Sequence, residues 1–390
     1  MAVKCNGSNN KMNILFITHY SEFYGANRSL LSLIEGLRKK GVKALVVIPW
    51  RGELSSVLDR RGIKYEIVTH HWWCHSLQGN SIKLIIDILL RHYQNAKATF
   101  RTVNLVKKNK IDIIYSNSST VILGYLTSIF TRKPHVWHLR EFGSEYDLRF
   151  DLGTNLSYRI ISKSKAIIAN SNSLKKYFQK YTGAKNVFVV YNGILSKRKI
   201  RENYQGYSYR KNKDFKFAIF GKINKNKGQK DAVIAFSKLL KIQHKVKLDI
   251  VGGGETQEIK DLIKRKKIGN KVNLIGYHAN PLFLMKNIDA LLMCSKIEAM
   301  GRVTAEAMIL GKPVIGYDST GTSELIIHKN NGLLYKNQKQ LVFYMDYLIK
   351  NPAVAKELGE KAHLFSYSNF SIEDYSTKIY AILEGIKRDA

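Results

Sequence analysis

Short apolar runs alternate with longer segments of helical periodicity along most of the chain. Runs rich in Val, Ile and Phe predict buried strands, and apolar residues spaced three or four apart predict amphipathic helices. In the first half, strands are expected at residues 13–18, 44–49, 65–69, 111–116, 135–138, 166–170 and 188–191, and helices at 29–40, 55–61, 82–108 and 120–130. This alternation indicates βαβ units that build a parallel sheet.

A second alternating series predicts a second domain. Its strands are expected at residues 215–220, 247–251, 272–275, 290–293 and 313–316, and its helices at 231–241, 256–266, 303–310 and 338–350. The two series are separated by a polar, charged stretch without apolar period. We therefore expect an α/β protein with two doubly wound, Rossmann-like domains, at 1–196 and 214–370, a linker at 197–213, and a C-terminal amphipathic helix within 371–390. Residues 1–11 are polar and are expected to be disordered.

Composition narrows the functional class. The chain has 390 residues, enough for two cores, and its three cysteines are too few and too far apart for a disulfide framework, which fits a reducing cytoplasm. No N-terminal apolar segment has the length of a signal peptide, and the apolar stretches are too short to span a membrane.

The net charge of +34 predicts attraction to polyanions, either nucleic acid or the anionic inner face of a membrane. The lysines are spread along the chain, which argues against specific nucleic-acid binding. Codon usage in an AT-rich genome, which favours Lys and Asn, is an alternative source of this charge.

The most informative segment runs from residue 295 to 308, where Glu298 and Glu306 flank Gly301 at the start of an expected helix. It follows a strand, and ligands of open α/β sheets bind beyond the carboxyl ends of strands. Backbone N–H groups at the helix start near Arg302 can hold a diphosphate. Two carboxylates at this spacing can hold the hydroxyls of a ribose and a sugar.

This segment resembles the signature of family 4 retaining glycosyltransferases, which have the GT-B fold of two Rossmann-like domains facing a cleft. Four more segments resemble motifs of that family and occur in its order: Val190-Tyr-Asn-Gly193, Gly221-Lys-Ile-Asn-Lys-Asn-Lys-Gly228, Val251-Gly-Gly-Gly254 and Asn273-Leu-Ile-Gly-Tyr277. The resemblance implies that the domain at 1–196 lies on the acceptor side and that the domain at 214–370 binds the nucleotide sugar. In that fold the last helix crosses back to the first domain, so residues 371–390 are expected to pack there.

The resemblance implies a role for each candidate residue. Glu298 and His138 contact the donor sugar and, with Lys227, are the expected catalytic residues. The donor is further bound by Glu306 at the ribose, by Tyr277 near the base, and by the loop that begins at Gly25. The diphosphate is held by Lys222 and Lys227 and by the helix start at Gly301, Arg302, Val303 and Thr304. Lys222 departs from the family, which usually has Arg there, and thereby loses a bidentate grip.

The sequence contains no Asp-x-Asp, so the positive charge that neutralises the leaving diphosphate is expected to come from lysines and backbone instead of a metal. Neither metal nor cofactor is therefore expected. The run His70-His-Trp-Trp-Cys-His75 is unsuited to wrapping a single ion. Trp72 and Trp73 are expected either in an acceptor surface or at lipid headgroups, with a plain packing role equally open.

The expected function is metal-independent, retaining transfer of a hexosyl or N-acetylhexosaminyl group, from UDP-sugar in preference. The expected acceptor is a lipid-linked or cell-surface glycan at the cytoplasmic face of a bacterial membrane, with the protein bound peripherally. An epimerase-like or phosphorylase-like activity on the same fold is an alternative. A basic membrane- or nucleic-acid-binding protein without catalysis is another.

Overall fold

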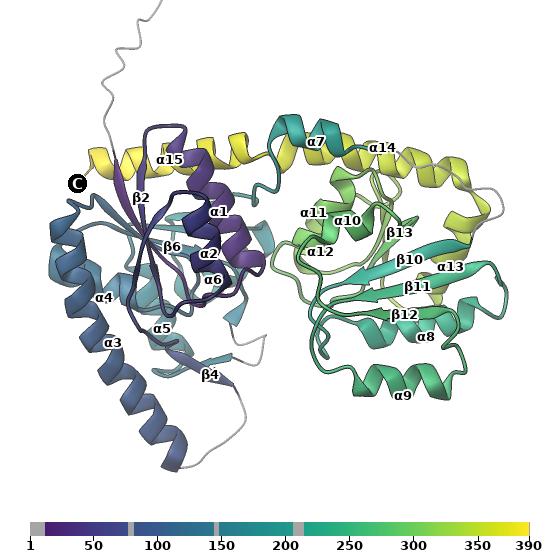
Figure 1. The fold of residues 1–390 in the computed structure, drawn as a ribbon, viewed down its shortest axis with the longest axis horizontal. Coiled ribbons are helices and arrows are strands. Elements are labelled where there is room, and N and C mark those ends of the chain that lie inside the picture. The colour runs from purple at the N-terminus through teal and green to yellow at the C-terminus, as the bar shows by residue number, and fades with distance from the viewer. Residues whose placement is uncertain (1–11, 77–81, 144–147, 206–213, 390) are drawn as a thin grey trace, which may run out of the picture. The chain divides into compact units, whose positions relative to one another are not determined.

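The computed structural model describes residues 12–76, 82–143, 148–205 and 214–389 of the chain. Two compact units are formed, one by Met1–Gly193 together with Ile372–Ala390 and the other by Ile194–Ser371. Each contains a parallel sheet with helices packed against it (Figure 1). The expected α/β class with two doubly wound sheets is therefore confirmed. The expectation for residues 1–11 lies outside the described residues.

The first unit is built on a seven-stranded parallel sheet of order β3-β2-β1-β5-β6-β8-β9. Its strands are β1 (Asn13–Ile17), β2 (Lys43–Ile48), β3 (Lys64–Ile67), β5 (Ile113–Ser116), β6 (His135–Leu139), β8 (Ala166–Ala169) and β9 (Val187–Val189). Its helices are α1 (Gly25–Arg38), α2 (Glu53–Arg60), α3 (Ile82–Lys108), α4 (Leu123–Thr131), α5 (Thr154–Ser162), α6 (Asn172–Thr182) and α15 (Ile372–Arg388). The strand order reverses between β1 and β5, which is the point where such sheets bind ligands.

The central strands β1, β5 and β8 are buried on both faces, which explains why they are largely apolar. Ile14 and Phe16 of β1 share a core with residues of α1, α2 and α15, whereas Leu15 and Ile17 share one with residues of α3 and α4. The C-terminal helix α15 is thus part of the first unit. Gly36 of α1 permits close contact with it, because a Cβ at that position would lie 2.4 Å from the Cβ of Ser376.

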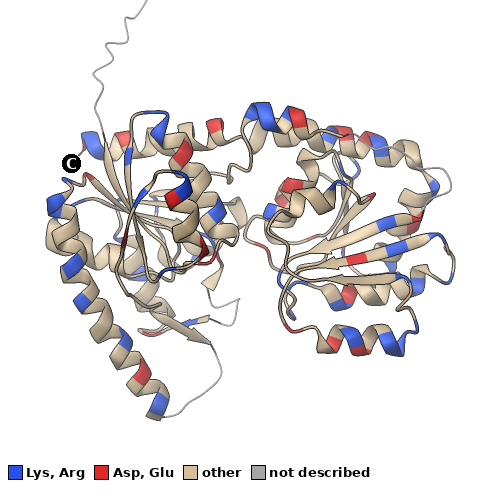
Figure 2. Cartoon of the chain, in the orientation of Figure 1, with Lys and Arg blue, Asp and Glu red and all other residues tan. Residues whose placement is uncertain are grey.

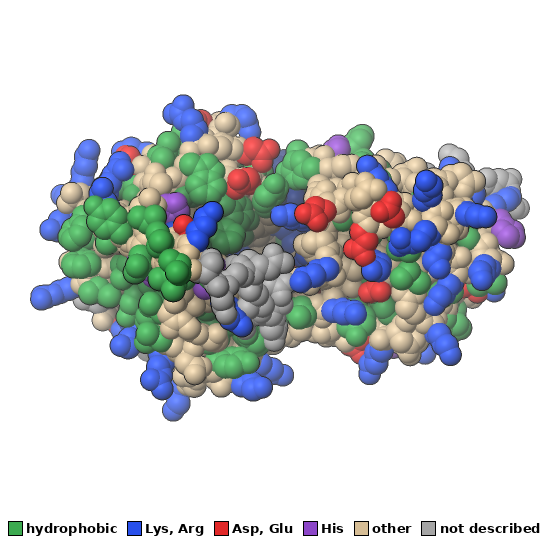
Figure 3. All heavy atoms as spheres, turned by 90° about the horizontal axis from the view of Figure 1, so that it is seen from below, with side chains coloured by type: hydrophobic (Ala, Val, Ile, Leu, Met, Phe, Trp, Pro, Cys, Tyr) green, Lys and Arg blue, Asp and Glu red, His purple; other side chains and the backbone are tan. Residues whose placement is uncertain are grey.

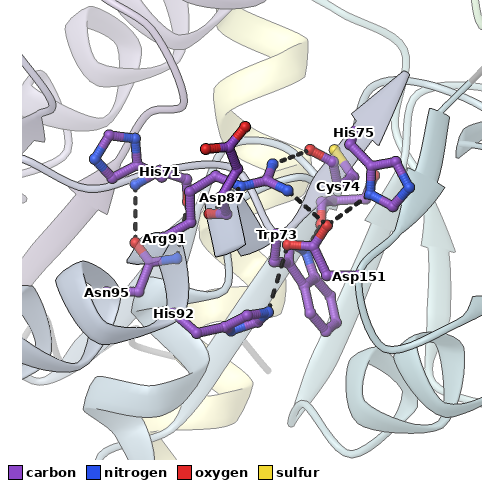
Figure 4. Close-up of polar contacts among 10 residues, drawn as sticks. His71, Trp73, Cys74, His75, Asp87, Arg91, His92, Asn95 and Asp151 are labelled. Atoms are coloured by element: carbon purple, nitrogen blue, oxygen red, sulfur yellow. Dashed lines mark hydrogen bonds and ion pairs between the residues drawn. The ribbon is translucent and has the colours of Figure 1, made fainter. Parts of the chain in front are cut away.

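A short antiparallel ribbon of β4 (Cys74–Ser76) and β7 (Leu148–Phe150) lies outside the main sheet and was not predicted. It is fastened to α3 through the buried carboxylate of Asp151 (Figure 4). That carboxylate lies 2.8 Å from His75 Nδ1, 3.1 Å from an Arg91 nitrogen and 3.4 Å from His92 Nε2. Arg91 also donates to the carbonyl oxygen of Cys74 at 2.8 Å. These contacts fix the middle of α3 to the ribbon.

The second unit has a six-stranded parallel sheet of order β12-β11-β10-β13-β14-β15, with its reversal between β10 and β13. Its strands are β10 (Phe215–Phe220), β11 (Val246–Val251), β12 (Val272–Ile275), β13 (Ala290–Met293), β14 (Val314–Tyr317) and β15 (Leu333–Tyr335). Its helices are α7 (Lys197–Asn203), α8 (Gln229–Leu239), α9 (Gln257–Arg265), α10 (Pro281–Met285), α11 (Arg302–Ile309), α12 (Thr320–Leu325), α13 (Gln338–Lys350) and α14 (Pro352–Asn369).

The segment 197–213, expected to be a linker, begins instead with a helix of the second unit. In α7, Ser196 caps the helix by accepting a hydrogen bond from Lys199 N at 3.3 Å, and Ile200 is fully buried. The guanidinium of Arg201 lies 4.9 Å from the ring centre of Tyr367 in α14. A single apolar residue gives no periodicity, so the sequence pattern does not predict this helix. Its packing against α14 stabilises it. Residues 206–213 lie outside the described part of the chain.

No helix in the described ranges is both long enough and apolar enough to cross a lipid bilayer. The longest, α3, carries charged and polar residues in every turn of its C-terminal half.

The contact between α1 and α15 yields a prediction with an internal control. Gly36→Ala forces a methyl group against Ser376, so we expect unfolding of the first unit to become easier by about 1–3 kcal/mol. Gly385 lies in α15 with open space around its Cβ position, and Gly385→Ala is expected to stabilise the same unit by about 0.5–1 kcal/mol. Chemical denaturation of both variants tests this. Equal shifts in the two variants would show that the helices are not packed this closely.

Candidate functional site

The loops that follow β10 and β13 meet at the reversal point of the second sheet. Gly228 makes this approach possible: it adopts φ +73°, and a Cβ there would lie 2.3 Å from the carbonyl oxygen of Cys294. The meeting brings the ammonium of Lys227 against the carboxylate of Glu298, with Nζ 2.7 Å from Oε2 and 3.0 Å from Oε1. Two residues 71 positions apart in sequence thus form one charged pair at the carboxyl edge.

The loop after β10 is also fixed to the turn after β11. Ile223 N donates to the carbonyl oxygen of Gly253 at 2.8 Å. A Cβ on Gly252 would lie 2.0 Å from the carbonyl oxygen of Gly221, and one on Gly254 would lie 2.5 Å from that of Ile223. The glycines of the two motifs are therefore required by backbone contact between the loops.

The side chains of Lys222 and Tyr277 are both exposed at this edge. The carbonyl oxygen of Lys222 accepts a hydrogen bond from Gln229 Nε2 at 3.2 Å, which fixes its backbone. Tyr277 lies beside the glycine turn, since a Cβ on Gly253 would be 3.5 Å from the Cβ of Tyr277. An exposed ring next to a flat turn is suited to stacking with a planar ligand.

The backbone of Glu298 is held by the start of α12, an element that the sequence pattern did not predict. Glu298 N donates to Thr320 Oγ1 at 2.9 Å, and Gly321 N donates to the carbonyl oxygen of Glu298 at 2.8 Å. Thr320 adopts φ +44°, and a Cβ on Gly321 would lie 2.5 Å from the carbonyl oxygen of Ala299. Thr320 and Gly321 are positioning residues whose only sequence signal is a run of small polar residues after a strand.

Helix α11 presents its N-terminus to the same place. Gly301 precedes it with φ +84°, and a Cβ there would lie 3.3 Å from Thr304 Oγ1 and 3.5 Å from the Cγ of Glu298. Thr304 is fully buried, and its hydroxyl has no hydrogen-bond partner within the described residues. Glu306 lies one helical turn after Arg302 and is almost fully buried. It accepts a hydrogen bond from Arg302 Nε at 3.0 Å.

The second unit therefore gathers nine of the predicted residues at one edge of its sheet: Lys222, Lys227, Tyr277, Glu298, Gly301, Arg302, Val303, Thr304 and Glu306. The first N–H groups of α11 have no acceptor within their own helix and carry its positive dipole end. Three cationic side chains and these donors suit an anionic ligand, while two carboxylates suit its hydroxyl groups. Among the described residues, no group of three or more His, Cys, Asp or Glu side chains is arranged to hold a metal.

The two remaining predicted residues belong to the first unit. His138 is the penultimate residue of β6 and is fully buried. Its Nδ1 lies 2.5 Å from the hydroxyl of Tyr115, and its Nε2 has no hydrogen-bond partner within the described residues. Burial, with a smaller effect from Arg140, lowers the pKa of His138 well below its ordinary value, so the ring is neutral. Gly25 is exposed at the first position of α1.

The structure separates the roles of the two adjacent tryptophans. Trp73 is fully buried, stacks on Trp137 with ring centres 6.0 Å apart, and donates from Nε1 to the carbonyl oxygen of Ser119 at 2.7 Å. An acceptor or lipid contact for Trp73 was therefore wrong, and its role is packing. Trp72 is 37% exposed, with Nε1 2.5 Å from the carbonyl oxygen of His19.

Known proteins match both halves of the chain. Residues 23–198 match the family described as Glycosyltransferase Family 4, and residues 201–365 match Glycosyl transferases group 1. A relative from Bacillus anthracis, N-acetyl-alpha-D-glucosaminyl L-malate synthase, is 26% identical over 78% of this chain and 76% of its own length. Alpha-monoglucosyldiacylglycerol synthase of Acholeplasma laidlawii is 21% identical over 93% of this chain and 94% of its own.

A solved structure shows the same fold. Anabaena Alr3699/HepE in complex with UDP-glucose superposes with a TM-score of 0.78 and 22% identity, covering 96% of this chain and all of that one. Together, the matched families, the two doubly wound sheets and this similarity identify the chain as a family 4 glycosyltransferase with the GT-B fold.

Proposed function

We propose that the protein transfers a hexosyl or N-acetylhexosaminyl group from a UDP-sugar to a glycan or lipid-linked glycan, with retention of anomeric configuration and without a metal. The observation that carries the proposal is the Lys227–Glu298 pair beside the N-terminus of α11. Support for the donor comes from HepE, whose solved complex holds UDP-glucose.

In this proposal each group at the second unit's edge has one task. Lys227, Lys222 and Arg302 neutralise the diphosphate as its charge grows during bond breaking. The N–H groups of Val303 and Thr304 and the unpartnered Thr304 hydroxyl bind phosphate oxygens. Glu306 accepts from the ribose hydroxyls, Glu298 from the sugar, and Tyr277 stacks on the base.

The first unit contributes His138 to the donor sugar, and Gly25 lets the loop before α1 approach it. Because His138 is neutral, it acts as a hydrogen-bonding group and does not carry charge to the phosphate. The leaving phosphate itself takes the proton of the acceptor hydroxyl on the same face as the departing bond. This route requires no separate protein base.

Removing the lysine charge tests the metal-free part of the proposal. Lys227→Ala is expected to lower the transfer rate by about 100-fold or more, because a charge-stabilising donor is lost, and wild-type activity is expected to persist in EDTA. Lys230→Ala is the matched control, since Lys230 lies three residues away and pairs with Glu258 at the surface. Loss of activity in EDTA and its return with Mn²⁺ would contradict the proposal.

Substitutions of Glu306 and Glu298 are expected to affect different steps, donor binding and turnover. Glu306→Ala should weaken UDP binding, because the ribose loses its acceptor, whereas Glu298→Ala should mainly lower kcat. Calorimetry with UDP and initial rates with UDP-glucose measure the two effects. Wild-type binding and rates in both variants would show that neither carboxylate handles the donor.

We further propose that the protein binds the cytoplasmic face of a membrane through the N-terminal half of α3. This half contains no buried residue and projects from the first unit (Figure 1). Its exposed apolar side chains form a surface here termed the helix tip: Ile82, Ile85, Ile86, Leu89, Leu90 and Tyr93. Figure 3, which views the side on which α3 projects, shows hydrophobic side chains gathered over that part of the unit.

The positive charges near the helix tip favour an anionic lipid surface as its binding partner. Lys83 and Lys97 lie on the same helix, the ammonium of Lys97 is 5.2 Å from the ring centre of Tyr93, and basic residues continue along α3 (Figure 2). An apolar helix face flanked by cations is the combination that binds at an anionic interface. The Acholeplasma relative, named for a diacylglycerol product, supports a lipid acceptor. Trp73, being buried, has no part in this contact.

Sedimentation with vesicles tests the helix tip. The wild type is expected to pellet with anionic vesicles but not with neutral ones, and less in high salt. Leu89→Glu is expected to abolish pelleting, because a charge replaces an apolar side chain that is 64% exposed. Leu364→Glu, at a 67% exposed leucine of α14, is the control. If the wild type is instead a dimer that Leu89→Glu dissociates in the absence of lipid, the tip contacts a second copy.

A further inference from the structure

A second polar cluster lies at the carboxyl edge of the first unit's sheet, around its reversal point between β1 and β5. The cluster is formed by residues that follow four of the strands. These are His19 after β1, Trp72 after β3, Ser118 and Ser119 after β5, and Glu141 after β6. The donor-handling residues proposed above do not include them.

Glu141 is held by one of its two carboxylate oxygens. Oε1 accepts hydrogen bonds from Ser118 Oγ at 2.8 Å, from Ser119 N at 2.7 Å and from Ser119 Oγ. Oε2 has no hydrogen-bond partner within the described residues. Burial raises the pKa of Glu141, and the serine donors partly offset that effect. The carboxylate is thus fixed in orientation and keeps the acceptor capacity of one oxygen.

The adjacent arginine does not neutralise this carboxylate by direct contact. Arg140 turns inward and donates to Asn117 Oδ1 at 2.8 Å and 3.2 Å, to Asn192 Oδ1, and to the hydroxyl of Tyr375 at 3.3 Å. Within the described residues it forms no ion pair with Glu141. The charge of Arg140 still acts on Glu141 and lowers its pKa, but less than burial raises it. Oε2 therefore keeps its capacity to accept a hydrogen bond from a ligand.

Aromatic rings complete this edge. The ring of His19 lies 4.0 Å from that of Tyr20 and 5.7 Å from that of the half-exposed Trp72. Burial lowers the pKa of His19 to about 3, so its ring is uncharged, and its Nδ1 is buried without a hydrogen-bond partner within the described residues. Burial raises the pKa of the Tyr20 hydroxyl, and the charge of Glu141 raises it further.

We propose that Glu141 selects the acceptor: its Oε2 accepts a hydrogen bond from a hydroxyl group of an uncharged sugar, and it repels acceptors that present a phosphate there. This inference rests on the proposed function and adds to it that the acceptor binds at the first unit. Uncharged rings suit the C–H faces of a sugar, and a carboxylate suits its hydroxyls. Phosphate would meet a fixed negative charge, so the same residue supplies attraction and exclusion.

The test separates acceptor from donor. UDP release from UDP-glucose is measured while octyl glycosides of glucose, galactose and N-acetylglucosamine are varied, with glucose 6-phosphate as the anionic probe. Glu141→Gln is expected to raise the KM for the neutral acceptor about 10-fold or more, the effect of losing a hydrogen bond to a charged group. The KM for UDP-glucose and its hydrolysis without acceptor are expected to stay as in the wild type.

The Glu141→Gln experiment has a matched control and defined outcomes that would contradict the inference. Glu35→Gln removes a carboxylate on α1 that pairs with Arg61, away from this edge, and is expected to behave as wild type. Because KM does not depend on the concentration of folded enzyme, partial misfolding of Glu141→Gln leaves the answer intact. An unchanged acceptor KM in Glu141→Gln, a wild type that prefers glucose 6-phosphate, or one that uses none of the three glycosides overturns the inference. Failure of the wild type to bind either UDP-glucose or UDP-N-acetylglucosamine would instead count against the proposed function.

Discussion

The nucleotide-sugar edge of the second unit depends on backbone segments that lie closer together than side chains allow. Gly228 against Cys294, Gly252 against Gly221, and Gly321 against Ala299 are contacts in which any Cβ would overlap a carbonyl group. The first of these approaches sets the distance between Lys227 and Glu298. The charges at this edge are therefore arranged by glycines that carry no charge themselves.

Both units have a polar site at the reversal of their strand order, but the side chains at the two sites differ in chemistry. In each, the reversal of strand order leaves an open place at the carboxyl ends of two neighbouring strands. The second unit fills it with cationic side chains, a helix N-terminus and paired carboxylates. The first unit places there aromatic rings, a neutral histidine and a carboxylate held by serines. One fold thus offers an edge suited to phosphate and an edge suited to hydroxyl groups.

Much of this architecture follows from local pattern. Strands buried on both faces are continuously apolar, so β1, β10 and β13 are visible in the sequence, and the glycine motifs mark where loops approach. Elements fixed by tertiary contact were not predictable in this way. Helix α7 has one buried apolar residue, and α12 is short and made of small residues.

The environment of individual side chains also could not be predicted from the sequence pattern. Trp72 and Trp73 are neighbours with identical local signals, yet one is half exposed and the other stacks in the core, because only the fold decides which faces Trp137. The same limit applies to Glu141. Its two serine partners lie more than twenty residues earlier, on the loop after another strand, and nothing in the local sequence connects them.

Helix α15 gives the chain an unusual order of assembly. The first unit is interrupted in sequence by the whole of the second, and its core needs Tyr375, Ile379 and Leu383 from the last helix. During synthesis from the N-terminus, all residues of the second unit are therefore available before the first unit has its full set. Until the last helix emerges, the apolar surface that α15 covers on α1 stays open to other contacts. The half of the protein made first is thus the half completed last.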